Sequence, residues 1–350
     1  MLFRKHRYTD AMSRDALKTL FHPFEKGDIE VPASTGDVLF LGAEPGFSLP
    51  QDFPRALHAV QGFRPDFLRL KASGYDAVPQ LLSGRRFDLT LVLSGRHRGQ
   101  NELRIAAALR ATSPGGLIVV AGSKGEGAAS LKKRLEALTA IAGSEPKYHG
   151  LAFWFHRPED ATVVEAILRS ENTGLTVEGR FATAPGMFSH DRIDPGSHML
   201  AEHLPDNLSG NIADFCAGWG YLAANVAERC PSVRSIDLYE ADFESLEAAK
   251  QNLGDVSPET KFFWHDLLSE PVGERYDAIV MNPPFHAGRA AEPNMGQGMI
   301  AVAAKSLKKG GRLLMVANRR LPYEQILETA FAEFSEIAGD KAFKVLMARR

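Results

Sequence analysis

The sequence predicts two tandem α/β domains, each built around a mostly parallel sheet. Its 350 residues are too many for one hydrophobic core and suit two domains. In both halves, short apolar runs alternate with amphipathic segments, which is the pattern of strand–helix units. These runs follow the same order in the two halves, so we expect a duplicated domain. The hydrophobic fraction of 44% is typical of a globular protein and excludes wholesale disorder.

Four features recur in the same order in both halves and are the evidence for a duplication. Residues 86–93 start with Arg-Phe-Asp and continue as an apolar run, and residues 275–280 start with Arg-Tyr-Asp and do the same. After a helical stretch, a Gly-Gly pair opens a second apolar run, at 115–120 and again at 310–316. A further helix and a terminal apolar run complete each half. Any α/β protein can show part of this series, but four aligned features favour duplication.

The expected domains are 1–170 and 208–350, joined by a linker or cap over 171–207 that is rich in Gly, Pro, Ser and His. In the second domain, the helix that follows the second strand carries its apolar residues on one face, from Phe243 to Leu253. The strands expected in this domain are 211–215, 235–239, 262–264, 277–281, 312–317 and 343–348.

Composition excludes several classes of protein. The formal net charge of −2 excludes a strongly basic tail but not a nucleic-acid partner. The two cysteines, Cys216 and Cys230, lack ligand spacing, so we expect no metal site or disulfide framework and a reducing compartment. No apolar run approaches the ~20 residues that span a bilayer, and the start lacks a secretory signal. We therefore expect a cytoplasmic protein without a membrane partner.

A glycine loop follows the first strand of the second half. Asp214 precedes Gly218 by four residues and Gly220 by six, and a helix follows. Spaced glycines let a backbone approach a ligand, and the start of a helix offers unpaired N–H groups. The loop departs from the G-x-G-x-x-G pattern of dinucleotide enzymes. The acidic residue favours instead a ligand with an ammonium and a carboxylate, as at the methionine end of S-adenosylmethionine.

Acidic residues also follow the next two strands. Glu240, rather than Asp237 inside its strand, is placed to accept both ribose hydroxyls. Asp266 can accept from an adenine amine, with the apolar neighbour Leu267 packing on the ring. Each acid alone is more often a surface or capping carboxylate. Their placement after successive strands predicts a nucleoside pocket.

The tetrapeptide Asn282-Pro-Pro-Phe285 follows the fourth strand directly. The prolines end the strand and free the Pro283 carbonyl, which with the Asn282 side-chain oxygen provides two acceptors for a planar amine. Phe285 can stack on the substrate. Acceptors on both hydrogens would stabilise the positive charge that develops when the amine takes a methyl group. A proline strand terminator is the simpler explanation, but the acidic glycine loop upstream favours the catalytic one.

With these motifs, the second half resembles the Rossmann-like S-adenosylmethionine-dependent methyltransferases, and more narrowly the bacterial 16S ribosomal RNA guanine-N2 methyltransferases. The resemblance implies two similar domains with mostly parallel seven-stranded sheets and an antiparallel terminal strand. It implies a catalytic second domain and a degenerate first domain that recognises substrate or gives structural support. The strings that carry it are 185–189, 194–197, 282–288, 307–311 and 316–323.

The resemblance also assigns further residues and partners. Cys216 stands where the family has the first glycine of its loop, and is counted among the cofactor-binding residues. From their own positions, His286 beside the tetrapeptide and Arg319 and Arg320 just past the fifth strand are expected at the substrate side of the site, with a structural role for His286 and a solvated face for the arginines as alternatives. The implied partner is ribosomal RNA, within the small subunit, and the implied enzyme is a monomer. In the first half, the place of the tetrapeptide is taken by Ser94-Gly-Arg96-His97-Arg98, whose basic triplet suits either RNA phosphates or a solvated loop.

Three alternatives remain open from the sequence. The acceptor could be guanine of the large-subunit (23S) RNA. It could be a protein glutamine, although those enzymes carry Asn-Pro-Pro-Tyr and a helical first domain. Finally, the chain could be a non-catalytic RNA-binding protein, although Asp214, Glu240 and Asn282 are all retained.

Overall fold

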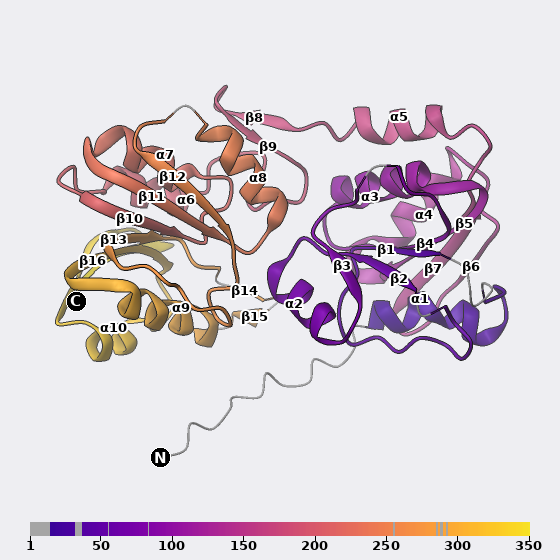
Figure 1. Cartoon of the computed structure of the whole chain (residues 1–350), viewed down its shortest axis with the longest axis horizontal. Helices are drawn as coiled ribbons and strands as arrows, with labels where there is room; N and C mark the ends of the chain where they lie inside the picture. The colour runs from indigo at the N-terminus through magenta and orange to yellow at the C-terminus, as the bar shows by residue number, and fades with distance from the viewer. Residues whose placement is uncertain are drawn as a thin grey trace, which may run out of the picture. The chain divides into compact units, whose positions relative to one another are not determined.

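The computed structural model contains two compact units, residues 1–173 and 174–350 (Figure 1). It describes residues 15–31, 37–54, 56–82, 84–254, 256–284, 286–287, 290–291 and 293–350. Within these ranges, no helix is long and apolar enough to cross a bilayer. The same residues contain no cluster of three His, Cys, Asp or Glu side chains that could hold a metal ion.

The first unit alternates strands and helices along its whole length. Its helices are α1 (Asp15–Lys26), α2 (Arg64–Ala72), α3 (Arg98–Ala111), η1 (Lys124–Glu126), α4 (Ala128–Glu136) and α5 (Thr162–Ser170). Its strands are β1 (Val38–Leu41), β2 (Leu57–Val60), β3 (Asp76–Val78), β4 (Phe87–Leu93), β5 (Thr112–Ser123), β6 (Gly143–Glu145) and β7 (Gly150–His156).

The second unit repeats this series. Its helices are α6 (Pro195–Glu202), α7 (Tyr221–Arg229), α8 (Phe243–Asn252), α9 (Pro293–Ser306) and α10 (Glu324–Ala330). Its main sheet contains β10 (Ser209–Phe215), β11 (Ser232–Glu240), β12 (Glu259–Trp264), β13 (Tyr276–Met281), β16 (Leu307–Asn318), β17 (Glu333–Gly339) and β18 (Phe343–Arg349). Two short hairpins are β8 (Leu175–Val177) with β9 (Phe181–Thr183), and β14 (His286–Ala287) with β15 (Ala290–Ala291).

Both main sheets have seven strands in the same order, which confirms the predicted duplicated α/β fold. The order is β3-β2-β1-β4-β5-β7-β6 in the first unit and β12-β11-β10-β13-β16-β18-β17 in the second. Five consecutive strands of each sheet pair in parallel, and β7 and β18 run antiparallel to both of their neighbours, which include the edge strands β6 and β17. Each sheet has an apolar core on both faces, because parallel sheets bury both sides.

The segment before β10 packs on the second unit rather than forming a free linker. Phe181 and Leu200 are buried in the same core cluster as residues of β10 and α7. Asn252 at the end of α8 accepts a hydrogen bond from the Ala182 amide at 2.7 Å and donates one to the Ala182 carbonyl at 3.0 Å. Residues 174–207 therefore complete one face of the second sheet.

The turn from β10 to α7 requires left-handed backbone at three positions. Cys216, Gly218 and Gly220 have φ of +60°, +54° and +89°. A Cβ on Gly220 would lie 2.5 Å from Leu253 Cδ1 and 3.3 Å from Ala249 Cβ, whereas one on Gly218 would meet no atom within 4 Å. Gly220 therefore allows α8 to pack closely against the turn, while Gly218 faces open space.

We expect Gly220→Ala to lower the free energy of unfolding by about 2 kcal/mol. About half of that comes from left-handed strain and the rest from overlap with Leu253. Urea unfolding of the full chain, followed by tryptophan fluorescence, measures the loss as a lower midpoint. Gly218→Ala is the matched control, because it adds the strain without the overlap. Equal losses in the two variants would contradict the packing argument.

Candidate active site

The carboxyl ends of adjacent parallel strands bring the sequence-predicted residues to one edge of the second sheet. Phe215 of β10 pairs with Tyr239 of β11 on one side and with Met281 of β13 on the other. The residues that follow these strands must therefore meet. The edge gathers Asp214, Cys216, Gly218, Glu240, Asp266 and Asn282.

Glu240 is tied to the glycine loop. Its Oε2 accepts the Gly218 amide at 2.7 Å, and its Oε1 accepts the Asp242 amide at 2.8 Å. Burial raises the pKa of the Glu240 carboxyl to about 7, against the lowering effect of these amide donors. Glu240 thus joins the end of β11 to the turn after β10 and keeps lone pairs for a ligand. Asp237, the alternative rejected from the sequence, lies within β11 and accepts from the Tyr276 hydroxyl at 2.8 Å.

Asp214 lies beneath the loop. Its side chain is 0% exposed, and its Oδ2 accepts the Ala223 amide in the first turn of α7 at 2.9 Å. Its Oδ1 is buried with no hydrogen-bond partner. Burial, with Glu240 nearby, raises the pKa of this carboxyl well above its usual value. An unpartnered buried carboxylate oxygen is costly, and a cationic ligand above the loop would reduce that cost.

Cys216 adopts the left-handed conformation that the family's glycine would allow freely. Its φ is +60°, and its half-buried thiol lies 3.6 Å from the sulfur of Met299 on α9. Burial raises the pKa of the thiol well above its usual value, with Glu240 and Asp214 adding to the effect. The Cys216 thiol is therefore protonated and is not an activated nucleophile.

The loop after β12 is closed by Asp266. Its Oδ1 accepts the Leu268 amide at 3.0 Å, and its Oδ2 accepts the Ser269 hydroxyl at 2.5 Å. The neighbouring Leu267 is 5% exposed and belongs to a core cluster. The carboxylate thus holds the turn and retains one lone pair on each oxygen for an amine.

Asn282 is oriented by two side chains of the α6 N-terminus. Its Nδ2 donates to Asp194 Oδ2 at 2.9 Å and to Ser197 Oγ at 2.7 Å. A carboxylate only accepts hydrogen bonds, so the NH₂ group must face Asp194 and the amide oxygen must face away. The Asp194 carboxylate also accepts the Ser197 amide at 2.8 Å as the cap of α6. Asn282 therefore presents an acceptor oxygen in a fixed direction.

Asp194 and Ser197 were missed as functional residues in the sequence. Asp-Pro-Gly-Ser is a recognisable helix start, with an acidic cap and proline in the first turn. Nothing in that signature reveals a partner 88 residues further along the chain. Only the packing of α6 against the sheet brings the cap to Asn282.

Of the remaining tetrapeptide, Pro283 is buried. Phe285 lies outside the described residues, so its predicted stacking role stays a prediction. His286 begins β14, and its side chain is likewise outside the description.

Arg319 and Arg320 follow β16 at the same edge and differ in their surroundings. The Arg319 guanidinium donates to Glu336 Oε1 at 2.7 Å, to the Phe343 carbonyl at 3.2 Å and to the Asp340 carbonyl. It thus links the end of β16 to β17 and β18. Arg320 is exposed, and its backbone amide donates to Asn318 Oδ1 at 3.1 Å. Arg320 is the better placed of the two for a substrate.

The register of the first sheet gives each site residue a counterpart. In the first unit, Leu41 at the end of β1 pairs with Val60 of β2 and Val92 of β4. In the second unit, Phe215 at the end of β10 pairs with Tyr239 of β11 and Met281 of β13. Leu41 and Phe215 therefore occupy equivalent positions in the two sheets. Phe40, Gln61 and Leu93 therefore stand where Asp214, Glu240 and Asn282 stand. The counterpart of Asn282 is one residue earlier than the Ser94 expected from the sequence, and all three chemical groups are replaced.

The loop after β1 is also filled by a side chain. A Cβ on Gly42 would lie 2.8 Å from Arg104 Nη1, which donates to the Leu93 carbonyl at 3.0 Å. The guanidinium thus lies against the turn that corresponds to the glycine loop. The first unit keeps the backbone of a nucleoside pocket without its acids or its open space.

The basic triplet of the first unit has partners within that unit. Arg98 forms an ion pair with Glu102 at 2.7 Å, and Arg96 approaches Glu126 at 3.5 Å. His97 caps α3. These contacts favour a structural role over the phosphate-binding alternative.

The donor set of the second unit fits S-adenosylmethionine. The buried oxygen of Asp214 that has no hydrogen-bond partner suits a cationic ligand. The Glu240 carboxylate at the end of β11 has free lone pairs that suit ribose hydroxyls. The open space beside Gly218 allows a ligand to approach the backbone. Each of these features is formed by described residues of one sheet edge.

Comparison with known proteins gives a family match and relatives that share part of their length with this chain. The model of the methyltransferase small domain matches residues 178–347. Ribosomal RNA small subunit methyltransferase C of Psychromonas ingrahamii is 28% identical over 265 residues, 75% of each chain. The protein of the same name from Salmonella newport is 37% identical over 172 residues, and the match spans 49% of this chain and 48% of that relative.

A solved structure matches nearly the whole chain. The T. thermophilus 16S rRNA N2 G1207 methyltransferase, in complex with AdoMet and guanosine, superposes with a TM-score of 0.77 at 25% identity, covering 96% of this chain and 91% of that one. Two methyltransferase-like domains are thus common to both. These matches confirm the resemblance found in the sequence, to the S-adenosylmethionine-dependent methyltransferases and, among them, to the bacterial small-subunit rRNA guanine-N2 methyltransferases.

Proposed function

We propose that this protein methylates the exocyclic N2 amine of a guanine in 16S ribosomal RNA, with S-adenosylmethionine as methyl donor. The observation that carries the proposal is the fixed amide of Asn282, whose oxygen is directed away from Asp194 and Ser197. The names of the matched relatives agree with this substrate. The enzyme acts as a cytoplasmic monomer on RNA of the small subunit.

The cofactor supplies a methyl group bonded to a sulfonium, which needs no further activation. Asp214, Cys216 and the backbone of Gly218 and Gly220 hold its amino-acid end. Glu240 accepts from the ribose hydroxyls. The adenine is held by Asp266 and Leu267, and Asn282 also borders the cofactor.

Asn282 and Pro283 perform the chemical step by accepting hydrogen bonds. The guanine amine would gain the methyl group as the bond from that carbon to the sulfonium sulfur breaks, leaving a neutral thioether. The nitrogen would carry positive charge until it loses one proton to solvent. Acceptor oxygens placed beforehand stabilise that charge without reorganisation. The target base must leave its stack to reach them, with Phe285 and His286 beside it and Arg319 and Arg320 at the rim.

The first unit binds no cofactor and serves substrate recognition or structural support. The apolar Phe40 and Leu93 at the corresponding positions, and Arg104 against the Gly42 turn, support this division of roles.

Asn282→Ala should reduce kcat for methyl transfer to 16S rRNA by at least about 100-fold, because the developing charge loses its acceptor. The dissociation constant for S-adenosylmethionine, measured by calorimetry, should stay within about twofold. Loss of cofactor binding in parallel with activity would contradict the catalytic role of this amide.

Asp194→Ala should lower kcat about tenfold with a small change in the KM for RNA, because the Asn282 amide is free to turn. The variant also loses a helix cap, so a matched control is needed. Asp160→Ala removes an acceptor of the Thr162 amide at the start of α5 and does not touch the site. If both variants lose activity equally, lost stability explains the effect and the orienting role is wrong.

The affinity for S-adenosylmethionine should rise about tenfold from about pH 6 to about pH 8, because a charged acceptor binds hydroxyls more strongly than a neutral one. The pKa of Glu240 is about 7 in the free protein, so it gains its charge within this window. Glu240→Gln should flatten the profile. Asp214, Asp242 and Cys216 face Glu240 and remain in the variant, so an unchanged slope would show that Glu240 is not the titrating group.

A further inference from the structure

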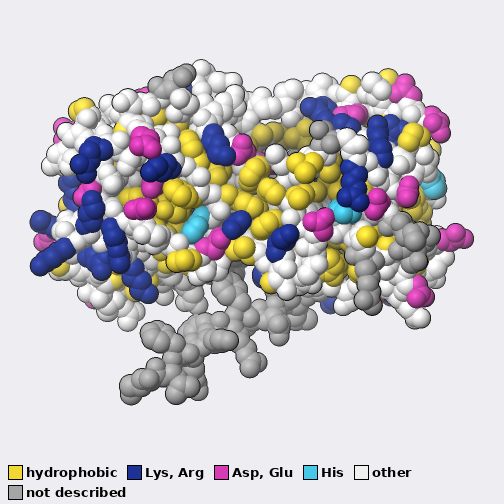
Figure 2. Space-filling view, viewed as in Figure 1, with side chains coloured by type: hydrophobic (Ala, Val, Ile, Leu, Met, Phe, Trp, Pro, Cys, Tyr) yellow, Lys and Arg dark blue, Asp and Glu magenta, His cyan; other side chains and the backbone are white. Residues whose placement is uncertain are grey.

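The edge of the second sheet opposite the candidate active site carries a concentration of cations. Residues 305–312 read Lys-Ser-Leu-Lys-Lys-Gly-Gly-Arg, with four cations and no acid, and the chain ends in Arg349-Arg350. Figure 2 shows Lys and Arg side chains gathered on the second unit around the C-terminus that Figure 1 marks. We name this surface the basic edge, formed by Arg275, Lys305, Lys308, Lys309, Arg312, Arg349 and Arg350.

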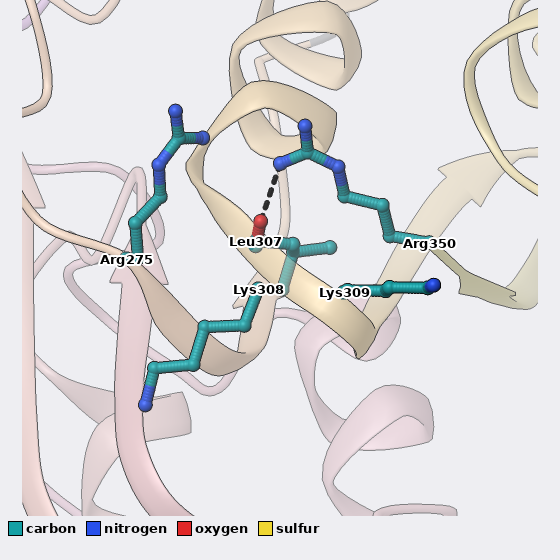
Figure 3. Close-up of a pocket in the computed structure, with 5 residues that line it drawn as sticks. All are labelled: Arg275, Leu307, Lys308, Lys309 and Arg350. Atoms are coloured by element: carbon teal, nitrogen blue, oxygen red, sulfur yellow. Dashed lines mark hydrogen bonds between the residues drawn. The ribbon is translucent and has the colours of Figure 1, made fainter.

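Two hollows lie within the basic edge, on either side of the turn that opens β16. The first has a volume of about 540 Å³ and is lined by Arg275, Leu307, Lys308, Lys309 and Arg350 (Figure 3). The second, of about 460 Å³, includes Arg312 and Arg349 in its lining. Gly310, with φ of +78°, lies in the turn between them. The hollows therefore present cations from three segments of the chain: residue 275, residues 308–312 and residues 349–350.

Some of these cations form hydrogen bonds or ion pairs within the protein that explain their presence. Arg350 Nη1 donates to the Lys305 carbonyl at 3.0 Å and to the Leu307 carbonyl, and so satisfies the end of α9 (Figure 3). Lys308 pairs with Asp277 at 2.8 Å, and Arg349 approaches Glu333 at 3.7 Å. These three side chains would be retained by a protein with no ligand here.

The other cations have no such explanation. Arg275, Lys305 and Lys309 are exposed, and no ion pair with a described residue is found for them. Arg312 donates to the side chain and carbonyl of Asn207, which carries no charge, and shares its hollow with Glu333 and Arg349. In a chain of net charge −2, repulsion among such neighbours costs stability unless a polyanion binds them.

We propose that the basic edge binds the phosphate backbone of the substrate RNA, at a place other than the target guanine. The inference rests on the proposed function, which supplies a polyanionic substrate. The six residues of β13 separate Arg275 from Asn282 by about 20 Å, so both edges cannot contact the same nucleotide. Contacts to phosphate add affinity and position without reading sequence. A base is then presented to Asn282 by an RNA held at two places.

The test is the double variant Arg275→Gln/Lys309→Gln in the full-length protein. Neither side chain has a described ion-pair partner, so the fold should be retained. The dissociation constant for 16S rRNA should rise on the order of tenfold, and the slope of log affinity against log salt should fall by about 1 to 2 between about 50 and about 200 mM KCl. The KM for RNA should rise in parallel while kcat at saturating RNA stays unchanged. Lys250→Gln/Lys261→Gln is the matched control, since it removes two exposed cations on α8 and β12.

The outcomes separate this proposal from the proposed function. RNA affinity and salt slope equal to those of the control variant would overturn the basic edge even if methylation proceeds. If the double variant binds RNA more weakly but the wild-type protein transfers no methyl group to rRNA, the proposal for the basic edge stands and the proposed activity is refuted. Binding to phosphatidylglycerol vesicles that the double variant loses, without loss of RNA binding, would also overturn the proposal and assign the surface to an anionic membrane.

Discussion

The site depends on one asymmetry of hydrogen bonding: a carboxylate accepts and cannot donate. Asp194 therefore fixes which end of the Asn282 amide faces it, and Ser197 holds the second hydrogen. The amide oxygen is left with one direction, toward the open edge of the sheet. Because Asp194 also caps α6, the position of the acceptor is tied to the start of a helix that packs on the second core. A side chain alone at a strand end would have no such rigidity.

The comparison between the two units separates what the fold requires from what the chemistry requires. Both sheets have the same strand order, and both turn after their first strand with positive φ, at Gly42 in one and Cys216 in the other. The acids and the amide of the second unit have become Phe40, Gln61 and Leu93 in the first. Gln61 now donates to the Ala43 carbonyl at 2.6 Å, within its own loop. The first unit thus forms the corresponding turn without an acid at the positions of Asp214 and Glu240 and without an amide at the position of Asn282.

The sequence predicted the fold and the strand-end residues because both follow from local patterns. Parallel strands end at one edge, so acids after successive strands must meet. Glu240 at the strand end contacts the glycine loop, whereas Asp237 within the strand accepts from Tyr276. Long-range partners could not be predicted in this way. Asp194 reaches Asn282 only through packing of α6, and Arg319 is held by Glu336 and Asp340 across a hairpin. The cation at residue 319 looks the same in the sequence whether it faces RNA or a carboxylate.

The second unit buries two carboxyls, Asp214 and Glu240, and the charge of Glu240 contributes to the raised pKa of Asp214. Asp214 has a buried oxygen with no hydrogen-bond partner, and burial raises the pKa of Glu240 to about 7. Removing either charge would relieve both burial and mutual repulsion, so stability of the fold does not explain them. A ligand that carries positive charge and hydroxyl donors would relieve the same cost on binding. The free energy that burial of these carboxyls costs the free protein is therefore recovered when such a ligand binds, which increases its affinity. A neutral or anionic nucleoside does not stabilise Asp214 in this way, so the site discriminates against it. The first unit has Phe40 and Gln61 at these positions, so it buries no carboxyl there and has no acid to bind such a ligand.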